Sequence, residues 1–168
     1  LDKRWPPRSH VALYGESDED PIEDLITRFA GRAFRRPVKR EDVARYIQLA
    51  QKQIEAGAPR AEALRASYTA IIASPRFYYL QESDGRLDDY ALASRLSYLL
   101  WSSMPDDELL SLAADDKLSD RKVLLAQVDR MLGDPKSAAF IRRFPQRWLR
   151  IDKLGSMPPQ GGFYFHRA

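Results

Sequence analysis

The sequence predicts an all-α protein, an irregular bundle of six or seven short helices with an extended N-terminal arm and an irregular C-terminal tail. Apolar residues recur near the helical period of about 3.6 residues in one segment after another. Capping residues and glycine or proline stops separate these segments. No segment shows a convincing apolar–polar alternation that would indicate a strand. With 168 residues, 44% hydrophobic and 30% charged, the chain is long enough to bury a core without disulfides.

Three helices are predicted in the first half of the chain, over residues 20–34, 40–56 and 59–73. Asp20 is a suitable N-cap, and Pro21 suits the first helical position. Pro37, Gly57 and Pro75 follow the three apolar patterns and end the helices, because neither residue type continues a helix readily. Residues 76–81 contain adjacent aromatic side chains without a helical period, so we predict a short strand or an extended plug there.

Four more helices are predicted after residue 87, over residues 88–103, 106–114, 119–133 and from 135 to about 149. Asp88 caps the first of them, and Met104 and Pro105 end it. Acidic residues follow at the start of the next helix, where the helix dipole favours negative charge. Pro145 lies inside the last pattern and predicts a kink or a split, since an interior proline costs about 3 kcal/mol.

We therefore divide the chain into a linker or arm over residues 1–19, a single helical domain over residues 20–157 and an irregular tail over residues 158–168. The first segment is acidic and rich in proline, and the last has neither period nor cap. We expect the tail to be truncated from a larger protein.

The composition excludes several classes of site. The sequence has no cysteine, which excludes disulfides, thiolate metal sites and covalent haem attachment within this chain. Its longest apolar run is far shorter than the roughly 20 residues that span a bilayer. His10 and His166 are weak candidates for axial haem ligands, and we expect both to be ordinary surface residues. The acidic pairs lie at predicted helix ends, where capping explains them.

Four segments carry a resemblance to a known family: FAGRAFRRPV at residues 29–38, ASPRFYYLQE at 73–82, LDDYALASRLSYLLWSSMPDDELL at 87–110, and QVDRMLGDPKSAAFIRRFPQRWLRIDKL at 127–154. In this order they resemble a helical domain of unknown function from planctomycete-type multidomain proteins associated with c-type cytochrome modules. The resemblance implies an extracytoplasmic, for example periplasmic, location. It also implies other modules of the parent protein as partners, a c-type cytochrome among them, with haem in an associated module and no cofactor in this chain.

The leading hypothesis is a non-catalytic packing and interaction module of such a protein. Two alternatives stay open. One is that the domain forms one wall of an oxidoreductase or polysaccharide-active site that other modules complete. The other is a nucleic-acid-binding helical domain, since basic residues cluster near the first and last helices.

The candidate structural or partner-binding residues are Arg32, Arg35, Arg36, Trp101, Arg147 and Trp148. Both tryptophans are expected to be core anchors because each buries a large apolar area. Arg35 and Arg36 follow the end of the first helix and are expected to be structural. One of them is expected to pair with a carboxylate of a later helix and hold the corner.

Overall fold

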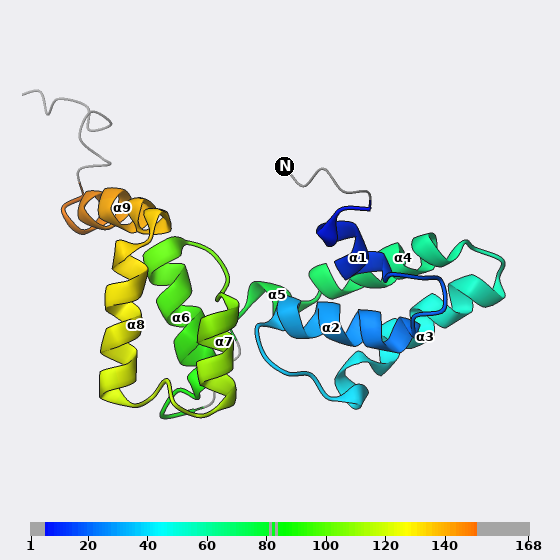
Figure 1. Cartoon of the computed structure of the whole chain (residues 1–168), viewed down its shortest axis with the longest axis horizontal. Coiled ribbons are helices and arrows are strands. Elements are labelled where there is room, and N and C mark those ends of the chain that lie inside the picture. Colours follow the sequence, from blue (N-terminus) through cyan, green and yellow to red (C-terminus); the bar gives the residue numbers. More distant parts are fainter. Residues whose placement is uncertain (1–5, 81, 83, 151–168) are drawn as a thin grey trace, which may run out of the picture.

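A computed structural model describes residues 6–80, 82 and 84–150, and within these residues it contains helices and no strand (Figure 1). The helices are α1 (Arg8–Tyr14), α2 (Ile22–Phe34), α3 (Arg40–Glu55), α4 (Arg60–Ile72), α5 (Pro75–Tyr78), α6 (Asp89–Trp101), α7 (Asp107–Ala114), α8 (Arg121–Gly133), the 3-10 turn η1 (Pro135–Ser137) and α9 (Ala138–Trp148). The all-α prediction is confirmed. All seven helices predicted from the sequence are found, with ends that differ by at most three residues.

Helix α1 lies within the segment that was predicted to be an extended arm. It follows Pro7 and ends at Gly15, whose φ of 90° is readily adopted only by glycine. Tertiary hydrogen bonds hold it: Tyr68 donates its hydroxyl proton to the carbonyl of Leu13, and Arg28 donates to the carbonyls of Ala12 at 2.8 Å and Val11 at 3.5 Å. A helix of seven residues is unstable alone, so these contacts explain why the local pattern did not reveal it.

Two further predictions need correction. The aromatic segment after Ser74 is neither strand nor plug but the single helical turn α5, which begins where the Ser74 hydroxyl accepts the N–H of Arg76. Gln81 at the end of that prediction lies outside the described residues. Pro145 does not split the last helix, because α9 continues from Ala138 to Trp148 with the proline inside. Residues 141–150, which include most of this helix, are solvent-exposed.

The buried apolar residues form two clusters. The first draws on α2, α3 and α4, and its members are Leu25, Ile26, Ala30, Ala33, Phe34, Val43, Tyr46, Ile47, Ala50, Ala63, Leu64, Tyr68 and Ile71. The second draws on α6, α7 and α8 and the segment between the last two, and its members are Ala93, Leu96, Leu100, Trp101, Leu109, Ala113, Leu118 and Met131. Figure 1 shows the corresponding helices as two neighbouring groups. The region predicted as one domain therefore contains two core clusters.

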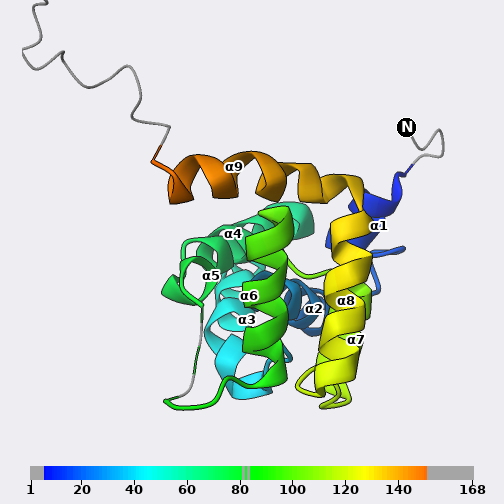
Figure 2. The same ribbon diagram turned by 90° about the vertical axis from the view of Figure 1, so that its left-hand side faces the viewer.

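Helix α9 lies across the ends of α6 and α8, as Figure 2 shows. Phe140 in its first turn packs against the second cluster, whereas the residues that follow are exposed. In the part of the chain that the structure describes, no helix is long and apolar enough to span a membrane.

Candidate functional site

The C-terminal end of α2 is a tightly organised corner built by Arg32, Arg35 and Arg36, which we call the arginine corner. Arg35 ends the helix in the left-handed conformation, with φ 59° and ψ 28°. The N–H of Arg36 bonds to the carbonyl of Gly31 at 3.1 Å, and the N–H of Arg35 bonds to that of Arg32 at 3.2 Å. These bonds satisfy carbonyls that the helix end would otherwise leave open. The corner therefore points two neighbouring arginine side chains in different directions.

The Arg35 side chain is buried, and the residue is only 4% exposed. Its guanidinium donates to the carbonyls of Phe77 at 3.0 Å, Tyr79 at 3.2 Å, Arg76 at 3.4 Å and Ala33 at 3.2 Å. Three of these carbonyls lie in or just after α5. A cation complements the negative end of a helix, so Arg35 ties the end of α2 to the end of α5.

Arg36 reaches in the other direction, to the start of α6. Its two terminal nitrogens lie 3.1 and 3.3 Å from the carboxylate oxygens of Asp88, and both side chains are partly exposed. Asp88 also accepts the N–H of Ala91 at 2.7 Å and so caps α6. The guanidinium of Arg36 also lies 6.0 Å from the ring centre of Tyr90. The expected pairing of one of these arginines with a carboxylate of a later helix is thus found.

Arg32 makes the third contact of the corner. It donates to Asp107, in the first turn of α7, at 3.0 Å, but both side chains are largely exposed. Exposed ion pairs contribute little to stability. The main strength of the corner therefore comes from Arg35 and Arg36.

We expect the Arg36→Ala variant to lose about 1–2 kcal/mol of unfolding free energy, because a charge-assisted pair is lost and the cap of α6 loses its partner. Arg32→Ala should cost less than about 1 kcal/mol. Urea denaturation followed by circular dichroism measures both. Asp88→Asn keeps a capping oxygen while removing the charge, so it should resemble Arg36→Ala. Equal losses for the Arg36 and Arg32 variants would contradict this ranking.

A second polar network surrounds Trp101. This residue is only 4% exposed, which confirms the prediction that it lies in the core. The indole N–H donates to the carbonyl of Met131 at 2.9 Å. The Arg130 guanidinium lies 5.5 Å and the Lys136 ammonium 4.5 Å from the ring centre. Arg130 also pairs with Asp106, the N-cap of α7, at 2.8 and 3.2 Å. This network joins α6, α7 and α8 around one ring.

The network has a predicted pH dependence. Partial burial raises the pKa of the Asp106 carboxyl. Hydrogen bonds from Arg130 and from the N–H of Leu109 together lower it by more than burial raises it, so the pKa of Asp106 lies below its usual value. A lowered pKa stabilises the fold above the pKa of the unfolded chain, near 4, and this stability is lost as the pH falls through the folded value. The urea concentration at the unfolding midpoint should therefore decrease when the pH is lowered below about 4. Asp106→Asn should show a smaller drop between pH 6 and pH 3; an unchanged drop would contradict this assignment.

Trp148 does not lie in the core, and this prediction was wrong. It is 73% exposed at the end of α9. Arg147 beside it is exposed as well. The sequence pattern correctly indicated an amphipathic helix, but α9 packs Phe140 against the second cluster and leaves its later aromatic residues exposed.

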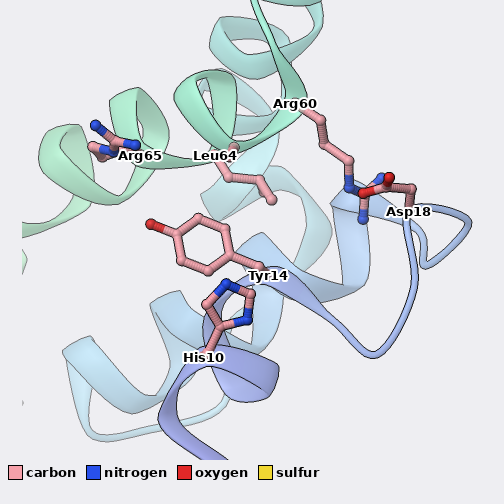
Figure 3. Close-up of a pocket in the computed structure, with 7 residues that line it drawn as sticks. His10, Tyr14, Asp18, Arg60, Leu64 and Arg65 are labelled. Carbon is pink, nitrogen blue, oxygen red and sulfur yellow. The ribbon is translucent and has the colours of Figure 1, made fainter. Parts of the chain in front are cut away.

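His10 lies on α1, in a region that was predicted to be irregular. Its ring lies 4.9 Å from that of Tyr14, and both line a pocket of about 390 Å³ between α1 and α4 (Figure 3). Arg60, Leu64 and Arg65 of α4 form the opposite wall. Arg60 also donates to the carbonyl of Asp20 at 2.6 Å, so it helps to hold the loop before α2. His166 and the tail over residues 158–168 lie outside the described residues.

Sequence reasoning missed one buried carboxylate. Asp89, 6% exposed, accepts the N–H groups of Leu118 at 2.6 Å and Ser119 at 3.2 Å, so it fixes the segment between α7 and α8. The acidic pair Asp88 and Asp89 was predicted to cap a helix, and only its first member does so. Among the described residues, no group of three histidine, cysteine or acidic side chains is arranged to hold a metal ion.

The fold and the corner define a helical protein with two core clusters joined through arginines. Comparison with known families divides the chain in the same way. Residues 22–82 are similar to a family described as PSD5, protein of unknown function (DUF1595), and residues 87–165 to one described as PSD4, protein of unknown function (DUF1592). No curated protein and no solved structure matches the chain. The resemblance to domains of unknown function is confirmed, and the arginine corner joins the two matched regions.

Proposed function

We propose that the chain is a non-catalytic helical packing and interaction module of a larger, extracytoplasmic, planctomycete-type protein that is linked to c-type cytochromes. The observation that carries the packing role is the arginine corner. The guanidinium groups of Arg35 and Arg36 contact α5 and the cap of α6 in the same chain rather than facing solvent alone. The pair between Arg36 and Asp88 links the two family-matching regions, whereas the hydrogen bonds of Arg35 to α5 lie within the first region.

This arrangement suits a spacer that holds neighbouring modules at a set distance. The buried Arg35 side chain donates to carbonyls at the end of α5, and Arg36 pairs with Asp88, the residue that caps α6. The connection between the two regions is thereby held at both of its ends. The resemblance supports the cytochrome link and the extracytoplasmic location. Since this sequence has no cysteine, covalently attached haem would belong to other modules of the parent protein.

The test is the mass and visible absorption of the native polypeptide that contains this sequence. We expect one polypeptide that carries covalently attached haem outside residues 1–168. In that polypeptide, the Arg35→Ala change should expose the connection between the two regions to proteolysis, whereas Arg40→Ala, which removes an exposed pair with Glu23, should not. A native polypeptide without haem would contradict the cytochrome link. Turnover of a redox or polysaccharide substrate by the 168-residue chain would contradict the non-catalytic role.

A further inference from the structure

Helix α9 carries an exposed stripe of large apolar side chains. Its members are Ile141, Phe144 and Trp148, together with Leu149, the residue that caps the end of the helix. Aromatic residues spaced four apart stack along it: the ring centres of Phe140 and Phe144 are 5.0 Å apart, and those of Phe144 and Trp148 are 6.2 Å apart. Such i, i+4 contacts order the side chains on one side of the helix. The stripe therefore forms a continuous apolar surface rather than scattered exposed residues.

The same helix is strongly basic. Residues 138–150 include Arg142, Arg143, Arg147 and Arg150 and no acidic residue. At about 100° per residue, Arg142 falls on one side of the apolar stripe and Arg147 on the other. Arg143 instead faces α6, where it contacts the Ser102 hydroxyl at 3.5 Å. The exposed surface of α9 thus has an apolar centre and cationic edges.

We propose that α9 docks the protein on the surface of a membrane that contains anionic lipids. A helix with aromatic and aliphatic residues on one face and arginines at its edges lies in the interface between lipid headgroups and acyl chains. The apolar stripe would bury its side chains there, while the arginines contact lipid phosphates. The charge of α9 favours an anionic occupant, since Arg142 and Arg147 flank the apolar stripe and residues 138–150 contain no acidic residue. The position of α9 also suits contact with a flat membrane surface, because the helix lies across the ends of α6 and α8 at one end of the molecule (Figure 2).

The first test compares sedimentation of the 168-residue chain with two kinds of vesicles. We expect binding to vesicles of equal parts phosphatidylcholine and phosphatidylglycerol, weak binding to pure phosphatidylcholine, and a blue shift of tryptophan emission on binding. Binding should also weaken as salt is added. Equal binding to both vesicles would overturn the charge argument. No binding to either vesicle would overturn the proposal and leave the stripe as a contact surface for protein.

Matched variants locate the binding surface. Arg142→Gln with Arg147→Gln should weaken binding to the anionic vesicles roughly 20- to 30-fold, at about fivefold for each cation. Arg121→Gln with Lys122→Gln removes the same charge at the opposite end of α8 and should change binding less than threefold (Figure 2). Equal losses in the two double variants would show that net charge alone attracts the chain, which overturns docking through α9.

A second pair of variants tests the apolar stripe. Trp148→Ser should weaken vesicle binding tenfold or more, because a large ring no longer enters the interface. Leu125→Ser removes an exposed apolar side chain of α8 that lies outside the stripe, and it should bind as the unchanged chain does. All six positions substituted in the two sets of variants are exposed, so circular dichroism should show unaltered folding. Normal vesicle binding by the folded Trp148→Ser variant would overturn the proposal.

Discussion

Replacement of Arg35 by alanine is expected to lower the unfolding free energy by about 3–5 kcal/mol, the loss typical when one partner of a buried charged contact is removed. The guanidinium donates to four carbonyl oxygens in a buried setting. Without it, the carbonyls at the end of α5 lose their donor, and each buried group left unsatisfied costs about 1–3 kcal/mol. Urea denaturation followed by far-ultraviolet circular dichroism would measure the loss.

Glycine at the same position separates the backbone from the side chain. Arg35 holds φ 59° and ψ 28°, a conformation that costs residues with a Cβ roughly 1–2 kcal/mol and costs glycine almost nothing. Arg35→Gly should therefore be about 1 kcal/mol less destabilising than Arg35→Ala. A loss below about 1 kcal/mol in the alanine variant would show that the buried contacts of Arg35 do not hold the corner.

The sequence was sufficient to predict the helix ends around this corner. Pro37 and the two arginines marked where α2 ends, and Asp88 was recognised as the cap of α6. The sequence did not show which arginine would meet Asp88, because the two residues are 52 positions apart and only the folded chain brings them together. Nor did the sequence show that Arg35 would be buried against main-chain carbonyls, since every residue has such a carbonyl and the sequence does not indicate which ones lie nearby.

The short helices were missed for a different physical reason. Helix α5 has four residues, too few for a periodic pattern, and it depends on the Ser74 cap and on Arg35. Helix α1 depends on Tyr68 and Arg28, which come from other helices. Local propensity does not form such short elements alone, because helix nucleation is unfavourable. Their presence is a consequence of the tertiary structure.

The two tryptophans show where helical periodicity stops being informative. Trp101 and Trp148 each end an amphipathic helix, and the pattern predicted the same buried place for both. Periodicity identifies an apolar face but not whether another element covers it. Helices α7 and α8 cover α6, whereas the apolar stripe of α9 faces outward among the described residues. Alanine substitution at the two positions should therefore have very different consequences.

Trp101→Ala is expected to cost about 3–5 kcal/mol, because it removes a buried ring and leaves a cavity in the second cluster. The loss includes the hydrogen bond to the Met131 carbonyl and the contacts of Arg130 and Lys136 with the ring face. Trp148→Ala should change stability by less than about 0.5 kcal/mol, since the side chain is largely exposed. Trp101→Phe keeps a ring and should fall between them. Circular dichroism during urea unfolding measures all three variants, and equal losses at the two tryptophan positions would place Trp148 in the core after all.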